Sequence, residues 1–254
     1  MPIRTLATDY DGTIATHGTV DPDTLGALRR LRDAGGTLIL VTGRELPQLK
    51  EVFPDLPLFH AVVAENGALL YWPETGKERP LCDPPEEPFV RALKERGVTP
   101  LSVGRVIVAT YEPHETTVLE VIRDLGLERQ VIFNKGAVMV LPSGVNKASG
   151  LTCALDELDI DAADVAGVGD AENDHALLQY CGLGAAVANA LPSLKDHADL
   201  VLTERHGAGV TQLIERILDG TIDDTPRRPR IQSKREQARV HQLADEHADV
   251  HPNA

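Results

Sequence analysis

Short, continuous apolar runs alternate with amphipathic stretches along most of the chain, and this alternation constrains the fold more than any other feature. The run 37–41 (TLILV) is typical of a strand covered on both faces. The preceding stretch 22–34 has the pattern of an amphipathic helix, with Gly35-Gly36 at its end. Strand–helix–strand alternation predicts a parallel sheet with helices on both faces. We therefore predict an α/β fold built on a doubly wound parallel sheet.

The expected elements form two groups. The first group comprises strands at 3–9, 37–41, 61–64, 164–168, 183–188 and 199–202, and helices at 22–34, 146–158, 173–180 and 208–218. The second group lies between the two halves of the first and comprises helices at 87–96 and 114–125 and strands at 105–111, 130–134 and 137–141. The middle group has about the size of a small inserted α/β module.

Composition marks the boundaries of this module. Prolines and acids crowd between Pro80 and Pro88, which indicates a linker, and Pro142-Ser143-Gly144 returns the chain to the first group. We predict a discontinuous core domain, residues 1–82 and 143–220, and an inserted domain, residues 83–142. Residues 221–254 are polar, with mixed charge and few large apolar side chains, and we expect a disordered or loosely helical tail.

Charge and composition exclude several classes of function. The formal net charge of -14 argues against a general nucleic-acid surface, which needs clustered Lys and Arg, but it permits a small anionic substrate held by a local cation. No run of about 18 apolar residues is present, so we expect no membrane span. The start lacks a basic-then-apolar leader, and Cys82, Cys153 and Cys181 form neither a zinc pattern nor a disulfide framework. We therefore expect a cytoplasmic protein.

The first of four polar motifs, Asp9-Tyr10-Asp11-Gly12-Thr13, directly follows the first expected strand. Ligands of open parallel sheets bind beyond the carboxyl ends of the strands, where this motif lies. Two acids separated by one residue can both face one site, and Gly12 permits a tight turn. One carboxylate could attack phosphorus while the other handles the proton of the leaving group.

Two further motifs offer groups that suit phosphate. Thr42-Gly43-Arg44 follows the second expected strand, and a Thr hydroxyl with free backbone amides at a helix start suits phosphate oxygens. Lys147 lies near another helix start and could neutralise both the carboxylates and a phosphoryl group. Taken alone, each motif has a simpler interpretation: a capping Thr beside a surface Arg, and a solvated Lys.

The fourth motif, 167–174 (GVGDAEND), follows a later strand. Hard divalent cations prefer oxygen ligands, and Mg²⁺ is typically bound by one or two carboxylates together with waters and phosphate. Asp170 is placed to supply such a carboxylate, although acids are also favoured at a helix N-terminus for electrostatic reasons.

Together and in this order, DYDGT, the Thr of VTGR, the Lys of GVNK and GDAEND resemble the four motifs of the haloacid dehalogenase superfamily of phosphohydrolases, over roughly residues 3–218. The place of the inserted module resembles the subgroup with a short type C2 cap. This resemblance implies that Asp9 is the nucleophile, that Asp11 is the general acid and base, and that Thr42 and Lys147 hold the phosphoryl oxygens.

The resemblance also implies a cofactor and a binding set. Mg²⁺ is the expected cofactor, bound by Asp9, Asp11 through its carbonyl, Asp170 and Asp174. The residues expected at the substrate are Gly43, Arg44, Asn66 and Asn173.

The function expected from this resemblance is a Mg²⁺-dependent phosphatase. Its substrate would be a small phosphorylated metabolite, either phosphoglycolate or a sugar phosphate, with the small cap favouring a small organic phosphate. Two alternatives stay open. A phosphomutase would use the same aspartyl-phosphate, and a non-catalytic module would sense phosphate or bind a partner. The two acids of the first motif argue against the latter, because binding alone needs no nucleophile.

Overall fold

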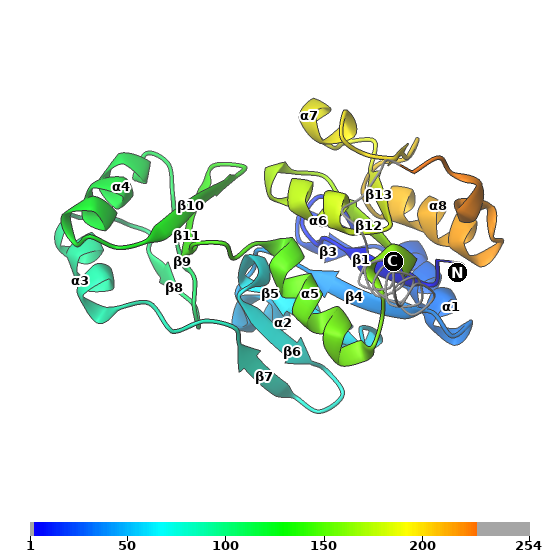
Figure 1. Ribbon diagram of the computed structural model, residues 1–254, viewed down its shortest axis with the longest axis horizontal. Helices are drawn as coiled ribbons and strands as arrows, with labels where there is room; N and C mark the ends of the chain where they lie inside the picture. The colour runs from blue at the N-terminus through cyan, green and yellow to red at the C-terminus, as the bar shows by residue number, and fades with distance from the viewer. Residues whose placement is uncertain (1–2, 228–254) are drawn as a thin grey trace, which may run out of the picture.

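The structure is a computed structural model that describes residues 3–227. It contains a large sheet and a small sheet that lie beside each other, with helices around both (Figure 1). The strand order of the large sheet is β14-β13-β12-β1-β4-β5-β6-β7. Every pairing from β14 to β5 is parallel, whereas β6 and β7 are antiparallel additions at one edge. The predicted α/β fold with a doubly wound parallel sheet is confirmed.

The strands of the large sheet are β1 (Thr5–Thr8), β4 (Thr37–Val41), β5 (Ala61–Ala64), β6 (Leu69–Trp72), β7 (Lys77–Pro80), β12 (Val165–Gly169), β13 (Leu183–Ala186) and β14 (Leu200–Val201). The longer helices around it are α1 (Pro22–Asp33), α2 (Leu46–Val52), α5 (Lys147–Leu158), α6 (His175–Tyr180) and α8 (His206–Leu218), with a short α7 (Pro192–Lys195). Helix α1 packs against α8, and α5 packs against α6. Strands β1, β5, β12 and β13 are buried along their whole length, as parallel strands covered on both faces must be.

Single-turn helices connect several of these elements: η1 (Leu56–Leu58), η2 (Glu65–Gly67), η3 (Ala162–Asp164), η4 (Glu172–Asp174) and η5 (Thr221–Asp224). A short hairpin, β2 (Ala15–Thr16) and β3 (Thr19–Val20), follows the first motif. This hairpin, α2 and the β6–β7 pair have no counterpart among the predicted elements. Strand β7 is polar and only partly buried, so it lacks the apolar pattern by which the other strands were predicted.

The small sheet has the order β10-β11-β9-β8 and is entirely antiparallel. Its strands are β8 (Ser102–Val103), β9 (Val108–Tyr111), β10 (Arg129–Asn134) and β11 (Ala137–Pro142), and its helices are α3 (Glu87–Glu95) and α4 (Glu115–Asp124). A separate apolar core that includes Phe89, Leu93, Val118 and Val138 joins these helices to one face of the sheet. The boundaries of the inserted domain, 83–142, and of the discontinuous core stay predictions.

The two sheets meet at a small apolar cluster that includes Ala68, Val106, Ile107, Met139 and Leu141. We refer to the small sheet with α3 and α4 as the small domain, which corresponds to the predicted inserted domain. Beside the apolar cluster, the buried carboxylate of Glu65 accepts hydrogen bonds from three backbone N–H groups of this small domain. Its Oε1 lies 2.9 Å from the nitrogen of Arg105, and its Oε2 lies 2.8 Å and 3.0 Å from the nitrogens of Val106 and Ile107. One core residue thus fixes a loop of the inserted domain.

The chain beyond α8 begins with η5, whose Ile222 is buried in the main core. Most of the predicted tail, residues 228–254, lies outside the described residues. Within residues 3–227 no helix has the length and apolarity needed to cross a membrane.

Candidate active site

Three of the four motifs begin where three neighbouring strands end. Strands β12, β1 and β4 are adjacent and parallel, so their carboxyl ends share one edge of the sheet. Asp170 follows β12, Asp9 follows β1, and Thr42 follows β4. The order of strands in the sheet therefore brings together motifs that are far apart in the sequence.

Lys147 reaches the same edge from the first turn of α5. Asn146 caps this helix: its Oδ1 accepts the backbone N–H groups of Ala148 and Ser149 at 2.9 Å and 3.0 Å. The helix start packs directly on η2, where a Cβ at Gly67 would lie 1.9 Å from the carbonyl oxygen of Asn146. Gly67 has φ 104°, so only glycine suits this position. Capping and close packing together fix the point from which the Lys147 side chain extends.

The Lys147 ammonium lies between two carboxylates and is 1% exposed. Its Nζ donates to Oδ1 of Asp9 and to Oδ1 of Asp174, each at 2.6 Å. The other oxygen of Asp174 accepts the backbone N–H groups of Asp170, at 2.9 Å, and Ala171, at 3.0 Å. Asp174 therefore holds both the lysine and the loop of the fourth motif, and hydrogen bonds engage both of its oxygens.

Asp9, Asp170 and Asp174 form a buried acidic cluster, with one oxygen from each within 4.8 Å of the others. Oδ1 of Asp170 is buried and has no hydrogen-bond partner. A carboxylate oxygen that is removed from water without a new partner lowers the stability of the folded protein. Hard divalent cations prefer carboxylate oxygens as ligands, and here an unsatisfied buried oxygen lies beside a second carboxylate. These residues therefore fit a metal ion.

The electrostatics of the cluster point the same way. Burial raises the pKa of Asp9 to about 7, even though Lys147 acts to lower it. Burial likewise raises the pKa of Asp170 against the opposing effect of Lys135. Burial disfavours the charged form of Lys147, but Asp174 and Asp9 outweigh it and raise the pKa of the ammonium. The buried site thus holds more negative charge than its cations balance, and a bound divalent cation would relieve it.

Asp11 is paired with Arg44 through two hydrogen bonds. Nε of Arg44 lies 2.6 Å from Oδ2 of Asp11, and the second guanidinium nitrogen lies 2.7 Å from Oδ1. These bonds raise the pKa of Arg44. The Arg44–Asp11 pair connects the second motif to the first. Within the second motif, the backbone nitrogen of Arg44 donates to Oγ1 of Thr42 at 3.1 Å. Arg44, expected at the substrate, here has the acid of the first motif as its partner.

The other residues expected at the substrate form a buried amide network. Asn66 is fully buried with φ 53°, and its Oδ1 accepts from Nδ2 of Asn173 at 2.8 Å. Its Nδ2 lies 2.9 Å from Sδ of Met139 on β11. Gly43 packs against it, because a Cβ there would lie 3.2 Å from Oδ1 of Asn66. This network connects the second and fourth motifs with the small domain, and substrate contact by its members stays a prediction.

Three further residues at the site were not predicted from the sequence. Nζ of Lys135, at the tip of the β10–β11 hairpin, donates to the carbonyl oxygen of Asp11 at 3.0 Å and to Oδ2 of Asp170 at 2.8 Å. Nδ2 of Asn189 and Nδ1 of His206 both donate to the carbonyl oxygen of Gly12 at 2.8 Å. Asn189 follows β13, so the strand-end rule that selected the motifs could have found it.

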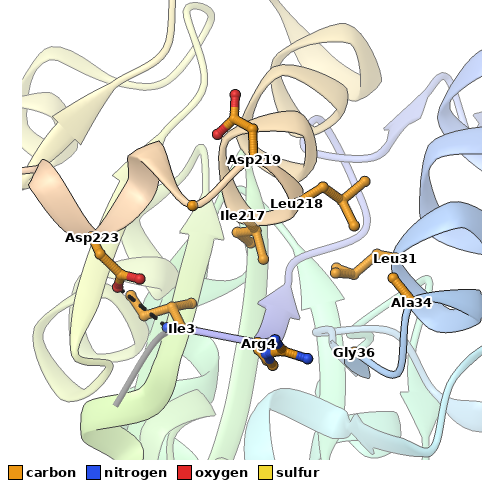
Figure 2. A pocket seen from close by; sticks show the side chains of 10 residues that line it. Ile3, Arg4, Leu31, Ala34, Gly36, Ile217, Leu218, Asp219 and Asp223 are labelled. Carbon is orange, nitrogen blue, oxygen red and sulfur yellow. Dashed lines mark hydrogen bonds between the residues drawn. The ribbon is translucent and has the colours of Figure 1, made fainter.

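A cavity of about 250 Å³ lies at the other end of β1, away from the motifs (Figure 2). Ile3 and Arg4, which precede β1, line it together with Leu31 of α1 and Ile217 of α8. None of the motif residues lines this cavity, so it is separate from the candidate active site.

Comparison with known proteins finds similar sequences over most of the chain. The sequence model of the haloacid dehalogenase-like hydrolases matches residues 6–83 and 99–214. A phosphoglycolate phosphatase of Methanothermobacter thermautotrophicus is 30% identical over 223 residues, which cover 85% of this chain and 99% of that protein. The corresponding enzyme of Sulfolobus acidocaldarius is 27% identical over 228 residues, which cover 87% of this chain and 100% of that protein.

Solved structures show the same fold at low sequence identity. A Thermoplasma acidophilum protein superposes with a TM-score of 0.73 at 18% identity, covering 86% of this chain and 99% of its own. The subclass IIB sugar phosphatase BT4131 superposes with a TM-score of 0.70 at 18% identity, covering 84% and 98%.

Proposed function

The chain belongs to the haloacid dehalogenase-like hydrolase family, and we propose that it is a Mg²⁺-dependent phosphatase with Asp9 as its nucleophile. The observation that carries this proposal is the buried contact of 2.6 Å between Nζ of Lys147 and Oδ1 of Asp9. It places a permanent cation next to the attacking carboxylate, within a cluster that also fits a divalent metal. Phosphoryl transfer depends mainly on such positioning and charge neutralisation.

The reaction has two displacements. In the first, a carboxylate oxygen of Asp9 bonds to phosphorus, the bond from phosphorus to the ester oxygen breaks, and Asp11 gives its proton to the departing alkoxide. In the second, Asp11 takes a proton from water, whose oxygen attacks phosphorus, and inorganic phosphate leaves while the carboxylate of Asp9 is restored. Thr42 and Lys147 hold the phosphoryl oxygens during both displacements.

The carboxylates of Asp9 and Asp170 and the carbonyl oxygen of Asp11 would hold Mg²⁺. When bound, the ion supplies positive charge that offsets both the carboxylates and the phosphoryl group. Asp174 accepts hydrogen bonds from Lys147 and from the Asp170 loop, so we propose that it mainly positions these two groups around the ion.

Phosphoglycolate is the substrate that we favour. Full-length relatives at 27% and 30% identity carry the name phosphoglycolate phosphatase, whereas the similarity to the sugar phosphatase concerns the fold alone. The acidic chain supports a small phosphorylated metabolite as partner rather than a nucleic acid. Its three cysteines, at wide spacings that suit neither a disulfide framework nor a zinc site, support the cytoplasm as compartment.

Phosphate release with Mg²⁺ tests the proposal on a panel of phosphoglycolate, hexose phosphates, glycerol phosphates and nucleotides. We expect release by the parent protein, none above background by Asp9→Asn, and loss of release after EDTA treatment. Asp33→Asn is the matched control, because Asp33 is exposed at the end of α1. Full turnover by Asp9→Asn, or after thorough EDTA treatment, would refute the mechanism. Isomerised sugar phosphate without released phosphate, seen by ³¹P NMR, would instead indicate a phosphomutase.

A further inference from the structure

Lys135 contacts two of the residues that the proposed function assigns to Mg²⁺, Asp11 and Asp170. Its Nζ lies 3.0 Å from the carbonyl oxygen of Asp11 and 2.8 Å from Oδ2 of Asp170. A divalent cation bound to Asp170 and to the carbonyl oxygen of Asp11 would lie close to this ammonium, and two cations at short range repel each other. The lysine of the small domain and the metal therefore compete at this position.

The backbone of Lys135 lies at the tip of a tight hairpin beside the fourth motif. Asn134 pairs with Ala137, so Lys135 and Gly136 form a two-residue turn, with φ 50° and 84°. The hairpin points toward α6 in Figure 1, and β10 contacts η4 of the fourth motif. A Cβ at Gly12 would lie 2.5 Å from Nζ of Lys135, so the first motif leaves room for the ammonium.

Three arginines of the small domain have ion-pair partners away from the site. Arg96 pairs with Asp124, Arg105 with Glu78, and Arg129 with Glu86. Among the lysines and arginines of the small domain within residues 3–227, only Lys135 forms an ion pair with a residue of the four motifs. Its side chain is 48% exposed, so it can also meet a ligand that enters from solvent.

We propose that Lys135 selects substrates that carry a second anionic group, such as a carboxylate, one or two carbons from the phosphate ester, and that Mg²⁺ binding releases it for this role. The proposal rests on the proposed function. Once a metal is bound to Asp170 and Asp11, the ammonium is repelled by the ion but stays on a hairpin that lies over the site. With the phosphoryl group held by Lys147 and Thr42, the rest of the substrate extends toward the small domain, where its anionic end pairs with Lys135.

Calorimetric titration of the substrate-free protein with Mg²⁺ tests the exchange without any turnover. Lys135→Met should bind Mg²⁺ about tenfold more tightly than the parent, because the ion no longer displaces a charge-assisted hydrogen-bonding partner. Lys94→Met is the control, since Lys94 is an exposed lysine on α3 of the same domain, and its Mg²⁺ affinity should match the parent. Equal Mg²⁺ affinity in Lys135→Met and the parent would overturn the exchange.

Selectivity is tested with two substrates that differ at one group: phosphoglycolate carries a carboxylate where ethyl phosphate carries a methyl group. The ratio of kcat/KM for phosphoglycolate to that for ethyl phosphate should fall about tenfold or more in Lys135→Met, mainly through KM for phosphoglycolate. Lys135→Arg should retain most of the ratio, and Lys94→Met all of it. An unchanged ratio in Lys135→Met would overturn the selectivity.

The failure of this proposal differs from that of the proposed function. If the parent releases phosphate from no substrate, the phosphatase assignment fails, while the Mg²⁺ titration still reports on Lys135. If the parent is active but Lys135→Met retains both the parent ratio and the parent Mg²⁺ affinity, only this proposal fails. Thermal unfolding followed by circular dichroism shows that the variants are folded, as expected for a turn residue with a half-exposed side chain.

Discussion

The guanidinium of Arg44 binds both carboxylate oxygens of Asp11, at 2.6 Å and 2.7 Å. This fork geometry fixes the plane of the carboxylate more tightly than a single bond would. Asp11 is the group that we propose to move protons in both displacements, so its direction matters for each. We therefore propose that Arg44 positions Asp11 for proton transfer.

Arg44→Met should lower kcat about 10- to 100-fold, because a misplaced catalytic group loses much of its effect. Asp11→Asn should lower it further, and the double variant should be no slower than Asp11→Asn, since Arg44 acts through Asp11. Arg44→Lys should not restore the rate, because an ammonium cannot form the paired bonds. Steady-state kinetics of this double-mutant cycle, with the exposed Arg91→Met as control, gives the measurement. Losses that add independently would assign Arg44 to the substrate instead.

Lys147→Met should cost both turnover and stability. It leaves the carboxylates of Asp9 and Asp174 buried without their shared cation, and breaking a buried ion pair costs about 3–5 kcal/mol. Mg²⁺ should recover part of the free energy of unfolding, because it adds positive charge to the same cluster. Urea unfolding with and without Mg²⁺ measures this, with Lys94→Met as control. A variant as stable as the parent in EDTA would contradict the role given to the ammonium.

The fold could be predicted largely from local patterns. Strands β1, β4, β5, β12 and β13 are apolar enough to be found in the sequence, and three of the four motifs follow strands. The β6–β7 pair was not predicted. Strand β6 (LLYW) has the same apolar pattern as the strands that were predicted and was overlooked, whereas β7 (KERP) has no buried residue and depends on β6 for its strand geometry. A polar edge strand carries little sequence signal of its own.

The parts of the site that could not be predicted depend on long-range contacts. Lys135 is 124 residues from Asp11 in sequence and reaches it only because the inserted domain packs over the sheet edge. No local pattern in the sequence predicts that packing. The pairing of Asp11 with Arg44 likewise depends on the relative position of two loops, so Arg44 was predicted to bind substrate. The structure brings Asp9, Lys147 and Asp170 together, and their chemical roles stay predictions.

Glu65→Gln should loosen the junction between the two domains. The buried carboxylate accepts the backbone N–H groups of Arg105, Val106 and Ile107, and an amide offers one acceptor oxygen and a competing donor. Loss of charge-assisted bonds to buried donors should cost about 1.5–3 kcal/mol. Hydrogen exchange should accelerate at residues 105–107, while exposed Glu51→Gln on α2 changes nothing there. Unchanged exchange at these amides would show that the apolar cluster alone holds the junction.

Asp21 provides a pH-dependent contribution to stability. It caps α1, its Oδ1 accepting the backbone N–H of Thr24 at 2.9 Å and its Oδ2 accepting from the Thr24 hydroxyl at 2.6 Å. Burial acts to raise the pKa of Asp21, but the bonds to Thr24 outweigh it and lower the pKa below the model-peptide value of 3.8.

Because the folded-state pKa of Asp21 is the lower one, its ionised form stabilises the folded protein above pH 3.8, and this stabilisation is lost as the pH falls through the folded-state pKa. Asp21→Ala should therefore lower the free energy of unfolding by about 1 kcal/mol at pH 7, and the difference from the parent should shrink below about pH 4. Asp21→Asn keeps a capping oxygen, so its free energy of unfolding at pH 7 should fall less than that of Asp21→Ala. Asp23→Ala, in the first turn of α1, should lower the free energy of unfolding less than either. Urea unfolding at pH 7 and pH 3 measures both differences. A loss in Asp21→Ala that is equal at the two pH values would mean that the cap stabilises α1 through hydrogen-bond geometry alone, without a contribution from its charge.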